Sequence, residues 1–201
     1  MIVGVGNGSI DIGRRNAGCR NGARSMIQSN AKANELYPSA SGDTPFGPEA
    51  FRNVMRYLAG AVCVISTSGG SGKHGLTASA VCSVCAEPPT LLVIVNRTSR
   101  THPHIRKNGT FSVNVLSEQQ ADVAKLLSSK SDNQFAQVPH TPANDGSILI
   151  DDTLAHFHCR VIAEHDVGTH TIFVGGIVRG KVGSGEPLLY YNTNFAALKS
   201  L

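Results

Sequence analysis

Small hydroxyl side chains interrupt an otherwise apolar stretch of the chain, HGLTASAVCSVCAEPP (residues 74–89). If this stretch is one regular strand, Thr77, Ser79 and Ser83 share one face, because successive side chains of a strand point to opposite sides. Small hydroxyls beside exposed backbone amides receive phosphate oxygens without crowding them. The stretch therefore predicts a surface that binds an anionic group such as a phosphate.

A second polar cluster, NRTSRT (residues 96–101), stands where an expected strand ends and a short helix begins. The amides at a helix N-terminus and the guanidinium of Arg97 or Arg100 complement the charge of a phosphate. The alternative is a strand end followed by a turn that Ser99 caps. From the residues alone, both interpretations stay open.

The pair Cys82 and Cys85 has the CxxC spacing of zinc sites and of dithiol redox centres. No second CxxC is present in the sequence, and no helix is expected to begin after Cys82. On a regular strand, residues three apart point to opposite faces, so the two sulfurs cannot meet unless a bulge changes the register. We therefore interpret these residues as buried or semi-buried free thiols.

Two histidine pairs are further candidates for metal ligands. His156 and His158 share one face of an expected strand, but a metal site requires a third ligand from elsewhere. His102 and His104 flank a proline, which is typical of a capped turn. The glycine runs GVGNG and TSGGSGK lack the spacing of nucleotide-binding loops, and no serine stands in a GxSxG elbow. We expect neither a metal site nor a serine nucleophile.

The composition is that of one folded domain with reduced thiols. Of the 201 residues, 41% are hydrophobic and 16% charged, which suffices for a core, and the net charge of +4 predicts no nucleic-acid-binding face. Five cysteines without the spacing of a disulfide framework favour the cytoplasm. No apolar run approaches the roughly 20 residues of a membrane helix, and the first residues are not typical of a signal peptide.

Residues 1–45 are rich in Gly, Ser, Asn and Ala without hydrophobic periodicity, which predicts a disordered or extended N-terminal tail. An organelle transit peptide is the alternative for this arginine-containing segment. The folded domain is expected over residues 46–201. Its first helix begins at Pro48, and one face of that helix carries four apolar residues: Phe51, Val54, Met55 and Leu58.

Strands outnumber helices in the rest of the domain. A capping box of Ser117 and Gln120 predicts a second helix that runs to about Leu127. Most connections are too short to be crossovers between parallel strands, so we expect an antiparallel barrel with a few packed helices. The expected strands are 61–67, 74–88, 90–96, 109–116, 154–165 and 170–182, with a short extended piece at 187–195.

Taken in order, these segments resemble the flavin reductase domain, in particular the short-chain NAD(P)H:flavin oxidoreductases that serve two-component monooxygenases. The resemblance covers about residue 46 to the end of the chain. It implies the FMN-binding split barrel, a mainly β, antiparallel Greek-key fold with a few packed helices, and a homodimer with flavin near the subunit interface. Its segments are FRNVMRYLAGAVCVIST, HGLTASAVCSVCAEPPTLLVIVN, SRTHPHI, GTFSVNVL, HCRV, VGTHTIFVGGIV and PLLYYN.

The resemblance also implies roles for individual residues. His170 corresponds to a histidine near the nicotinamide side of the flavin. The family commonly has an aspartate before this histidine, whereas Thr169 stands there in this chain. The implied flavin contacts are Thr77, Ala78 and Ser79 at the phosphate and ribityl chain, Cys82 and Ser83 beside the isoalloxazine ring, and Asn96, Thr98, Ser99 and Arg100 on the next segment.

The implied activity is reduction of FMN or FAD by NADH or NADPH, with the reduced flavin passing to a partner monooxygenase. Such a reaction needs placement of two cofactors rather than an acid–base pair, because hydride passes between stacked rings. The missing aspartate leaves one alternative open: a flavin-binding electron carrier or redox sensor that does not turn over free flavin. The residues leave open the choice between FMN and FAD, and between the two nicotinamide nucleotides.

Overall fold

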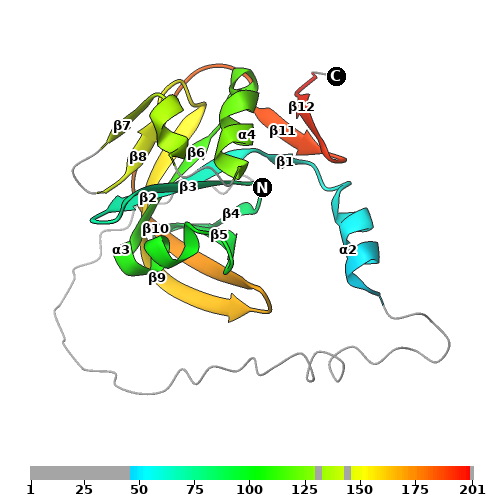
Figure 1. The fold of residues 1–201 in the computed structure, drawn as a ribbon, viewed down its shortest axis with the longest axis horizontal. Coiled ribbons are helices and arrows are strands. Elements are labelled where there is room, and N and C mark those ends of the chain that lie inside the picture. The colour runs from blue at the N-terminus through cyan, green and yellow to red at the C-terminus, as the bar shows by residue number, and fades with distance from the viewer. Residues whose placement is uncertain (1–45, 130–132, 143–145, 200–201) are drawn as a thin grey trace, which may run out of the picture.

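The computed structural model describes residues 46–129, 133–142 and 146–199 (Figure 1). The predicted tail, residues 1–45, lies outside the described residues. Across the part of the chain that is described, no helix is long and apolar enough to cross a lipid bilayer.

A seven-stranded antiparallel sheet forms most of the domain, which confirms the mainly β prediction (Figure 1). Its long hairpin of β9 and β10, with 13 residues in each strand, lies next to β5 and β6. The spatial order is β3 (Gly72–Ala78), β2 (Cys63–Gly69), β6 (Thr110–Val115), β9 (Ala155–Val167), β10 (His170–Val182), β5 (Pro89–Asn96) and β4 (Val81–Ala86).

Two small sheets and short helices complete the described fold (Figure 1). The capping box of Ser117 and Gln120 is confirmed, and it precedes a helix that ends at Ser128. One small sheet contains β1 (Gly60–Ala61), β11 (Leu188–Tyr191) and β12 (Asn194–Ala197), and the other contains β7 (His140–Pro142) and β8 (Ile148–Ile150). The helices are α2 (Pro48–Met55), α3 (His102–Asn108) and α4 (Ala121–Ser128), with 3-10 turns η1 (Glu118–Gln120) and η2 (Gln134–Gln137).

The predicted strand 74–88 is two strands, so this prediction was wrong in one respect. The break falls at Ser79 and Ala80, after which the chain leaves β2 and pairs with β5. The amide of Val81 donates to the Ser79 carbonyl, and the amide of Ile94 donates to the Ala80 carbonyl, which holds the corner. Side-chain alternation therefore does not continue from β3 into β4.

Two apolar clusters fill the two sides of the sheet. Phe111 and Phe173 are the largest side chains that are fully buried, and both belong to the first cluster. That cluster also contains Cys63, Ile65, Leu91, Val93, Val95, Ile105, Val113 and Cys159. The second cluster lies under α4 and the small sheets and contains Val62, Val64, Leu116, Ala124, Leu127, Phe135, Val138, Ile148, Ile150 and Leu188.

Helix α2 begins at Pro48 as predicted but ends at Met55, so Leu58 of the expected apolar face lies in the turn after it. The helix lies beside the barrel and none of its residues is buried (Figure 1). Phe51 is 53% exposed and Leu58 is 69% exposed. The chain just after the helix is anchored by the amide of Asn192, which donates to the Arg56 carbonyl. The apolar face of α2 is therefore uncovered by the described residues.

Candidate functional site

Two adjoining hollows flank Thr77, with volumes of about 420 and 360 Å³. Both are lined by Thr77 and Ser128, and they bring together six of the nine predicted flavin contacts. The first hollow is lined by Val62, Thr77, Ala78, Ser79, Ala124, Lys125, Ser128, Tyr190, Thr193 and Phe195. The second is lined by Gly75, Leu76, Thr77, Thr98, Ser99, Arg100, Thr101, Leu127, Ser128, Ser129 and Gln134.

The hydroxyl of Thr77 is bonded to the protein itself. Its Oγ1 donates to the carbonyl of Ala124 at 2.6 Å, which joins β3 to α4. A hydroxyl has one proton to donate, so Thr77 can only accept from a further group. Its position between the hollows makes it a support for their shared wall, whereas the sequence had suggested a phosphate donor.

The turn after β5 also satisfies most of its own donors. The amide and the hydroxyl of Thr98 both donate to Asn96 Oδ1, each at 2.9 Å. The amide of Ser99 donates to the Asn96 carbonyl, and the amide of Thr101 donates to Ser99 Oγ. Thr101, rather than Ser99, is the residue that precedes α3. An anion at this turn is therefore met by side chains, and not by the row of helix amides predicted from the sequence.

The two arginines of this turn have different positions. The Nη2 atom of Arg97 donates to the carbonyl of Gly168 at 2.5 Å, and the amide of Arg97 donates to the carbonyl of Thr169 at 3.0 Å. Arg97 thus binds the turn between β9 and β10. Arg100 lines the second hollow, so it is the arginine placed to meet a phosphate there.

Strand register places His170 on the same face of the sheet as Asn96, the last residue of β5. His170 pairs with Asn96, and the next pairs on the same face are Ile172 with Ile94 and Val174 with Leu92. All six residues are half-buried, whereas Val93, Val95 and Phe173 on the opposite face are buried. We call this face of β5 and β10 the outer face. It is a partly covered apolar surface with His170 and Asn96 at one end.

Cys82 shares the outer face, because it pairs with Leu92. Ser83 pairs with Leu91 and therefore points to the other side of β4. The two residues that the resemblance puts beside the flavin ring are both exposed, but they do not share a face. Of the pair, only Cys82 lies on the same face as His170.

A β-bulge overturns the prediction that Cys82 and Cys85 point to opposite faces. The register shifts between Ser83 and Cys85, so that Cys85 pairs with Thr90, two residues before Leu92. The extra residue returns Cys85 to the face of Cys82. Each thiol bonds a nearby carbonyl, and both cysteines are free. Both are exposed, so the expectation of buried or semi-buried thiols was wrong: β4 is an edge strand, and the described residues do not cover it.

His170 begins β10, directly after a two-residue turn. Its Nδ1 lies 2.9 Å from the hydroxyl of Thr169. Thr169 occupies the position where the resemblance leads one to expect an aspartate. A hydroxyl can fix the orientation of the imidazole as a carboxylate does, but without adding a negative charge.

The other histidines occupy structural positions. His102 is 5% exposed and lies against Phe173, and His104 stacks on His74 with 3.4 Å between ring centroids. Burial lowers the pKa of His156, and Lys181 lowers it further. His158 is also buried. Among the described residues, no group of three or more His, Cys, Asp or Glu is arranged to hold a metal.

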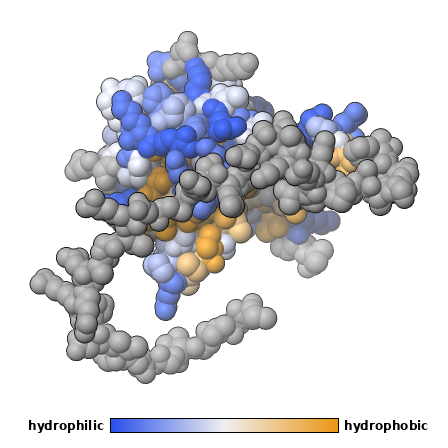
Figure 2. All heavy atoms as spheres, turned by 90° about the horizontal axis from the view of Figure 1, so that it is seen from below, coloured by the Kyte–Doolittle hydropathy of each residue, from blue (hydrophilic) through white to orange (hydrophobic). Residues whose placement is uncertain are grey.

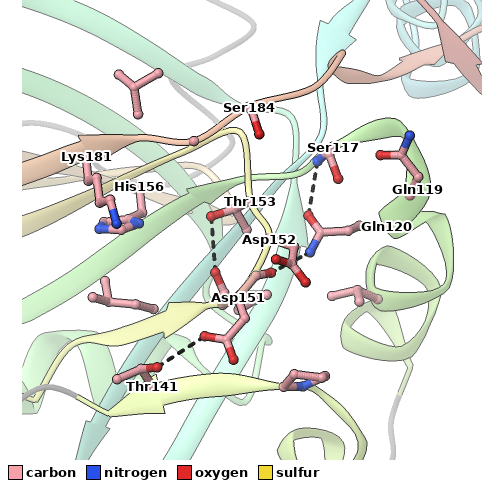
Figure 3. Close-up of a pocket in the computed structure, with 16 residues that line it drawn as sticks. Ser117, Gln119, Gln120, Thr141, Asp151, Asp152, Thr153, His156, Lys181 and Ser184 are labelled. Carbon is pink, nitrogen blue, oxygen red and sulfur yellow. Dashed lines mark hydrogen bonds between the residues drawn. The ribbon is translucent and has the colours of Figure 1, made fainter.

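A third hollow, of about 930 Å³ and the largest of the three described here, contains none of the predicted flavin contacts (Figure 3). It lies between η1, the β7–β8 hairpin and the ends of β9 and β10. Its polar groups bond one another: Thr141 donates to Asp151 Oδ1 at 3.2 Å, and Gln120 donates to the carbonyl of Asp151 at 2.8 Å (Figure 3). These bonds hold the segment before β9 in place. Because the polar groups are used within the protein and no predicted flavin contact is present, we do not take this hollow as the candidate site.

Sequence reasoning missed the contribution of α4 and of the C-terminal hairpin. Lys125 and Ser128 line the hollows from α4, and Tyr190 and Phe195 line the first hollow from β11 and β12. The capping box of Ser117 and Gln120 indicated α4 itself, but only the packing of α4 on β3 brings these side chains to Thr77. No pattern in the sequence signals that approach.

Comparison with known proteins gives a consistent family. The flavin reductase like domain matches residues 55–199. An FMN reductase (NADH) RutF of Methylorubrum extorquens is 37% identical over 163 residues, which are 80% of this chain and 81% of that protein. The reductase component of a 4-nitrophenol 4-monooxygenase/4-nitrocatechol 2-monooxygenase from Rhodococcus opacus is 35% identical over 170 residues, 85% and 88% of the two chains.

A solved structure shares the fold. The Streptomyces globisporus NADH:FAD oxidoreductase SgcE6, in complex with NAD and FAD fragments, aligns with a TM-score of 0.74 at 28% identity. The alignment covers 80% of this chain and 98% of that one.

Proposed function

The chain belongs to the flavin reductase like domain family, and we propose that it uses NAD(P)H to reduce FMN or FAD and supplies the reduced flavin to a partner monooxygenase. The observation that carries the proposal is the register of β5 and β10. It sets His170 beside Asn96 at the end of the outer face, directly before the turn that lines the second hollow.

The residues present fit a flavin in two respects. The outer face offers half-buried apolar side chains on which a flat ring can lie, and the hollows at Thr77 offer hydroxyls with Arg100 and Lys125 for a phosphate. The flavin and the nicotinamide carry the hydride chemistry themselves. The protein is required to bind them, to stack them and to exclude water.

Each predicted contact receives a role from its position. Ser79, Ser99 and Arg100 bind the phosphate, while Thr77 supports the wall between the two hollows. Ala78 leaves room for the ribityl chain, and Asn96 and Thr98 shape the turn. Cys82 lies beside the isoalloxazine ring. Ser83 points to the other side of β4 and contacts the ring only at its edge.

His170 contacts the nicotinamide or the flavin ring from the end of the outer face. Its Nδ1 is bonded to Thr169, so Nε2 is the ring nitrogen directed to a ligand. This role requires orientation rather than proton transfer. Thr169 supplies the orienting bond, which is our reason to favour a reductase over an electron carrier or redox sensor without free-flavin turnover.

We also propose a homodimer. Helix α2 and the turn that follows it leave the apolar side chains of Phe51, Val54 and Leu58 exposed, and β4 is an edge strand with exposed Val84. Figure 2 shows apolar surface on the side of β9 and β10, where Ile162 is 58% exposed. Uncovered apolar patches of this kind are typical of interfaces, and a second copy of the chain would cover them.

NADH is the donor that we propose, supported by the names of the relatives. We propose the cytoplasm as the compartment, because Cys63, Cys82, Cys85 and Cys159 are all free thiols. Burial raises the pKa of Cys63 and Cys159 to about 12, so these two thiols are unreactive core residues.

The decisive test is a set of four steady-state assays in which the purified protein is given NADH or NADPH with free FMN or FAD. We expect flavin-dependent loss of the reduced nicotinamide absorbance, faster with NADH, and the rates with the two flavins decide between them. Absence of flavin-dependent oxidation in all four assays would overturn the proposal. Bound flavin without turnover would indicate the carrier or sensor instead.

A further inference from the structure

A chain of hydrogen bonds runs from two buried residues, His102 and Thr171, to the exposed carboxylate of Asp166. His102 on α3 and Thr171 on β10 are 5% and 0% exposed, and His102 Nε2 lies 2.8 Å from Thr171 Oγ1. Thr171 Oγ1 in turn donates to Asp166 Oδ1 on β9 at 2.6 Å. Three elements of the fold thus meet at one threonine hydroxyl.

The single proton of Thr171 determines the direction of these bonds. Because Thr171 Oγ1 donates to the carboxylate of Asp166, it can only accept from His102, which must carry a proton on Nε2. Burial lowers the pKa of His102, and the nearby Arg106 lowers it further. The neutral imidazole protonated on Nε2 is therefore the form that fits this site.

Arg106 of α3 binds the carboxylate of Asp166 on its solvent-exposed side. Its Nη2 donates to Asp166 Oδ1 at 3.0 Å, and its Nε donates to Glu164 Oε2 at 3.1 Å. The bond from Thr171 is the largest cause that lowers the pKa of Asp166, and Arg106 adds to it. The carboxylate therefore stays charged and holds α3 against the β9–β10 hairpin.

The position of this group gives it a consequence for His170. Thr171 and Asp166 are the cross-strand pair next to His170 and Val167. Side chains alternate along a strand, so these bonds hold the face of the hairpin opposite to the one that carries His170. Arg97 also holds the turn, through the carbonyls of residues 168 and 169.

We infer that His102, Thr171 and Asp166 are positioning residues, which fix the β9–β10 turn so that His170 meets the nicotinamide in one orientation. The inference rests on the proposed role of His170. A positional error of about 1 Å at a reacting centre costs on the order of 100-fold in rate. Loss of the hydrogen bonds at Thr171 would loosen the turn and permit such an error, which gives these bonds a kinetic role.

The first test replaces the hydroxyl with a methyl group of the same shape, Thr171→Val. We expect kcat/KM for NADH to fall about 10- to 100-fold, while flavin affinity stays within twofold, roughly the error of such titrations. Thr153→Val is the matched control: Thr153 is also buried and its hydroxyl also donates a hydrogen bond, in this case to the carbonyl of Ile150, but it lies at the hollow of about 930 Å³. This control should keep the NADH kinetics of the unaltered protein.

A double-mutant cycle shows whether the network acts through His170. In a His170→Ala background, Thr171→Val should lower kcat/KM by less than about twofold. An equal loss in both backgrounds would contradict the inference. If Thr171→Val does not fold, Asp166→Asn removes the charge that holds Arg106 and is used in the same cycle.

Amide hydrogen exchange of the free protein separates this inference from the proposed function. We expect the amides of residues 168–170 to exchange about tenfold or more faster in Thr171→Val than in Thr153→Val. Unchanged exchange would overturn the inference, whatever the kinetics. Faster exchange together with full activity of His170→Ala would retain the positioning effect and reject the proposed role of His170.

Discussion

Replacing Ser79 with aspartate should separate a phosphate site from an incidental hollow. Ser79 lines the hollow of about 420 Å³, and a sphere of that volume has a radius of about 4.6 Å. A carboxylate on its wall therefore lies about 4.6 Å from an anion at its centre. Two like charges at that separation repel by about 0.9 kcal/mol in water and about 3.6 kcal/mol at an effective dielectric constant of about 20.

These limits correspond to a rise in the FMN dissociation constant of about 5- to 500-fold. The hollow is open to solvent, so the effect should shrink as salt is added. Quenching of flavin fluorescence on titration with protein measures the constant at low and high salt. Ser79→Asn serves as the control for size, because it adds similar bulk without charge, and Ser184→Asp puts the same charge at the largest hollow.

The phosphate assignment would be wrong if Ser79→Asp bound FMN as tightly as the unaltered protein. Equal weakening by aspartate and asparagine would identify crowding rather than repulsion as the cause. A comparable effect of Ser184→Asp would show that the overall charge, and not the position, matters. Only a salt-dependent loss confined to Ser79→Asp agrees with the reasoning.

Further expectations concern the hairpin that carries His170 and the proposed interface. His170→Ala should lower kcat/KM for NADH more than it lowers flavin affinity, and an equal loss in both would place His170 in the flavin site proper. Gly168 has φ of 55°, so Gly168→Ala should cost about 1–3 kcal/mol of stability, measured as a lower denaturation midpoint and accompanied by slower NADH oxidation. Leu58→Asp should convert the proposed dimer to a monomer in light scattering, and an unchanged mass would remove α2 from the interface. The pKa of Asp166 is lowered in the folded protein, so its stabilising contribution is complete above the ordinary aspartate range and is lost as pH falls through the lowered value. The midpoint in urea should therefore fall less on acidification in Asp166→Asn, and an identical fall in both proteins would contradict this. The pKa of His102 is also lowered in the folded protein, so its contribution to stability is likewise lost as the pH falls. His102→Gln should therefore also reduce the loss of stability below about pH 6.5, measured by the same urea midpoint.

The sequence was informative about the fold where local signals coincide with tertiary structure. The Ser117 and Gln120 capping box and the apolar spacing of α2 both depend on neighbours a few residues away, and both predictions are confirmed. The break at Ser79 and Ala80 depends on which partner strand each half selects. No local pattern distinguishes one long strand from two strands at opposite edges of a sheet.

The site was harder to predict, for two physical reasons. The bulge after Ser83 changes which face Cys85 occupies, and a single extra residue leaves no distinct mark in the sequence. The side chains of Lys125 and Ser128 reach the site only because α4 packs on β3. The family resemblance supplied residue roles, whereas the register of β5 with β10 explains how His170 and Asn96 come to share a face.

Thr77 shows why a hydroxyl row in a sequence does not by itself define a phosphate site. Its proton goes to the carbonyl of Ala124, and the Thr98 hydroxyl donates to Asn96. Because these hydroxyl protons are already donated within the protein, they cannot donate to a phosphate. The side chains are small, however, so they leave the hollows open. The charge complement then falls on Arg100 on one side of Thr77 and Lys125 on the other. If a phosphate binds here as we propose, the small hydroxyl side chains leave the space for it, and Lys125 of α4 and Arg100 of the turn after β5 supply the positive charge.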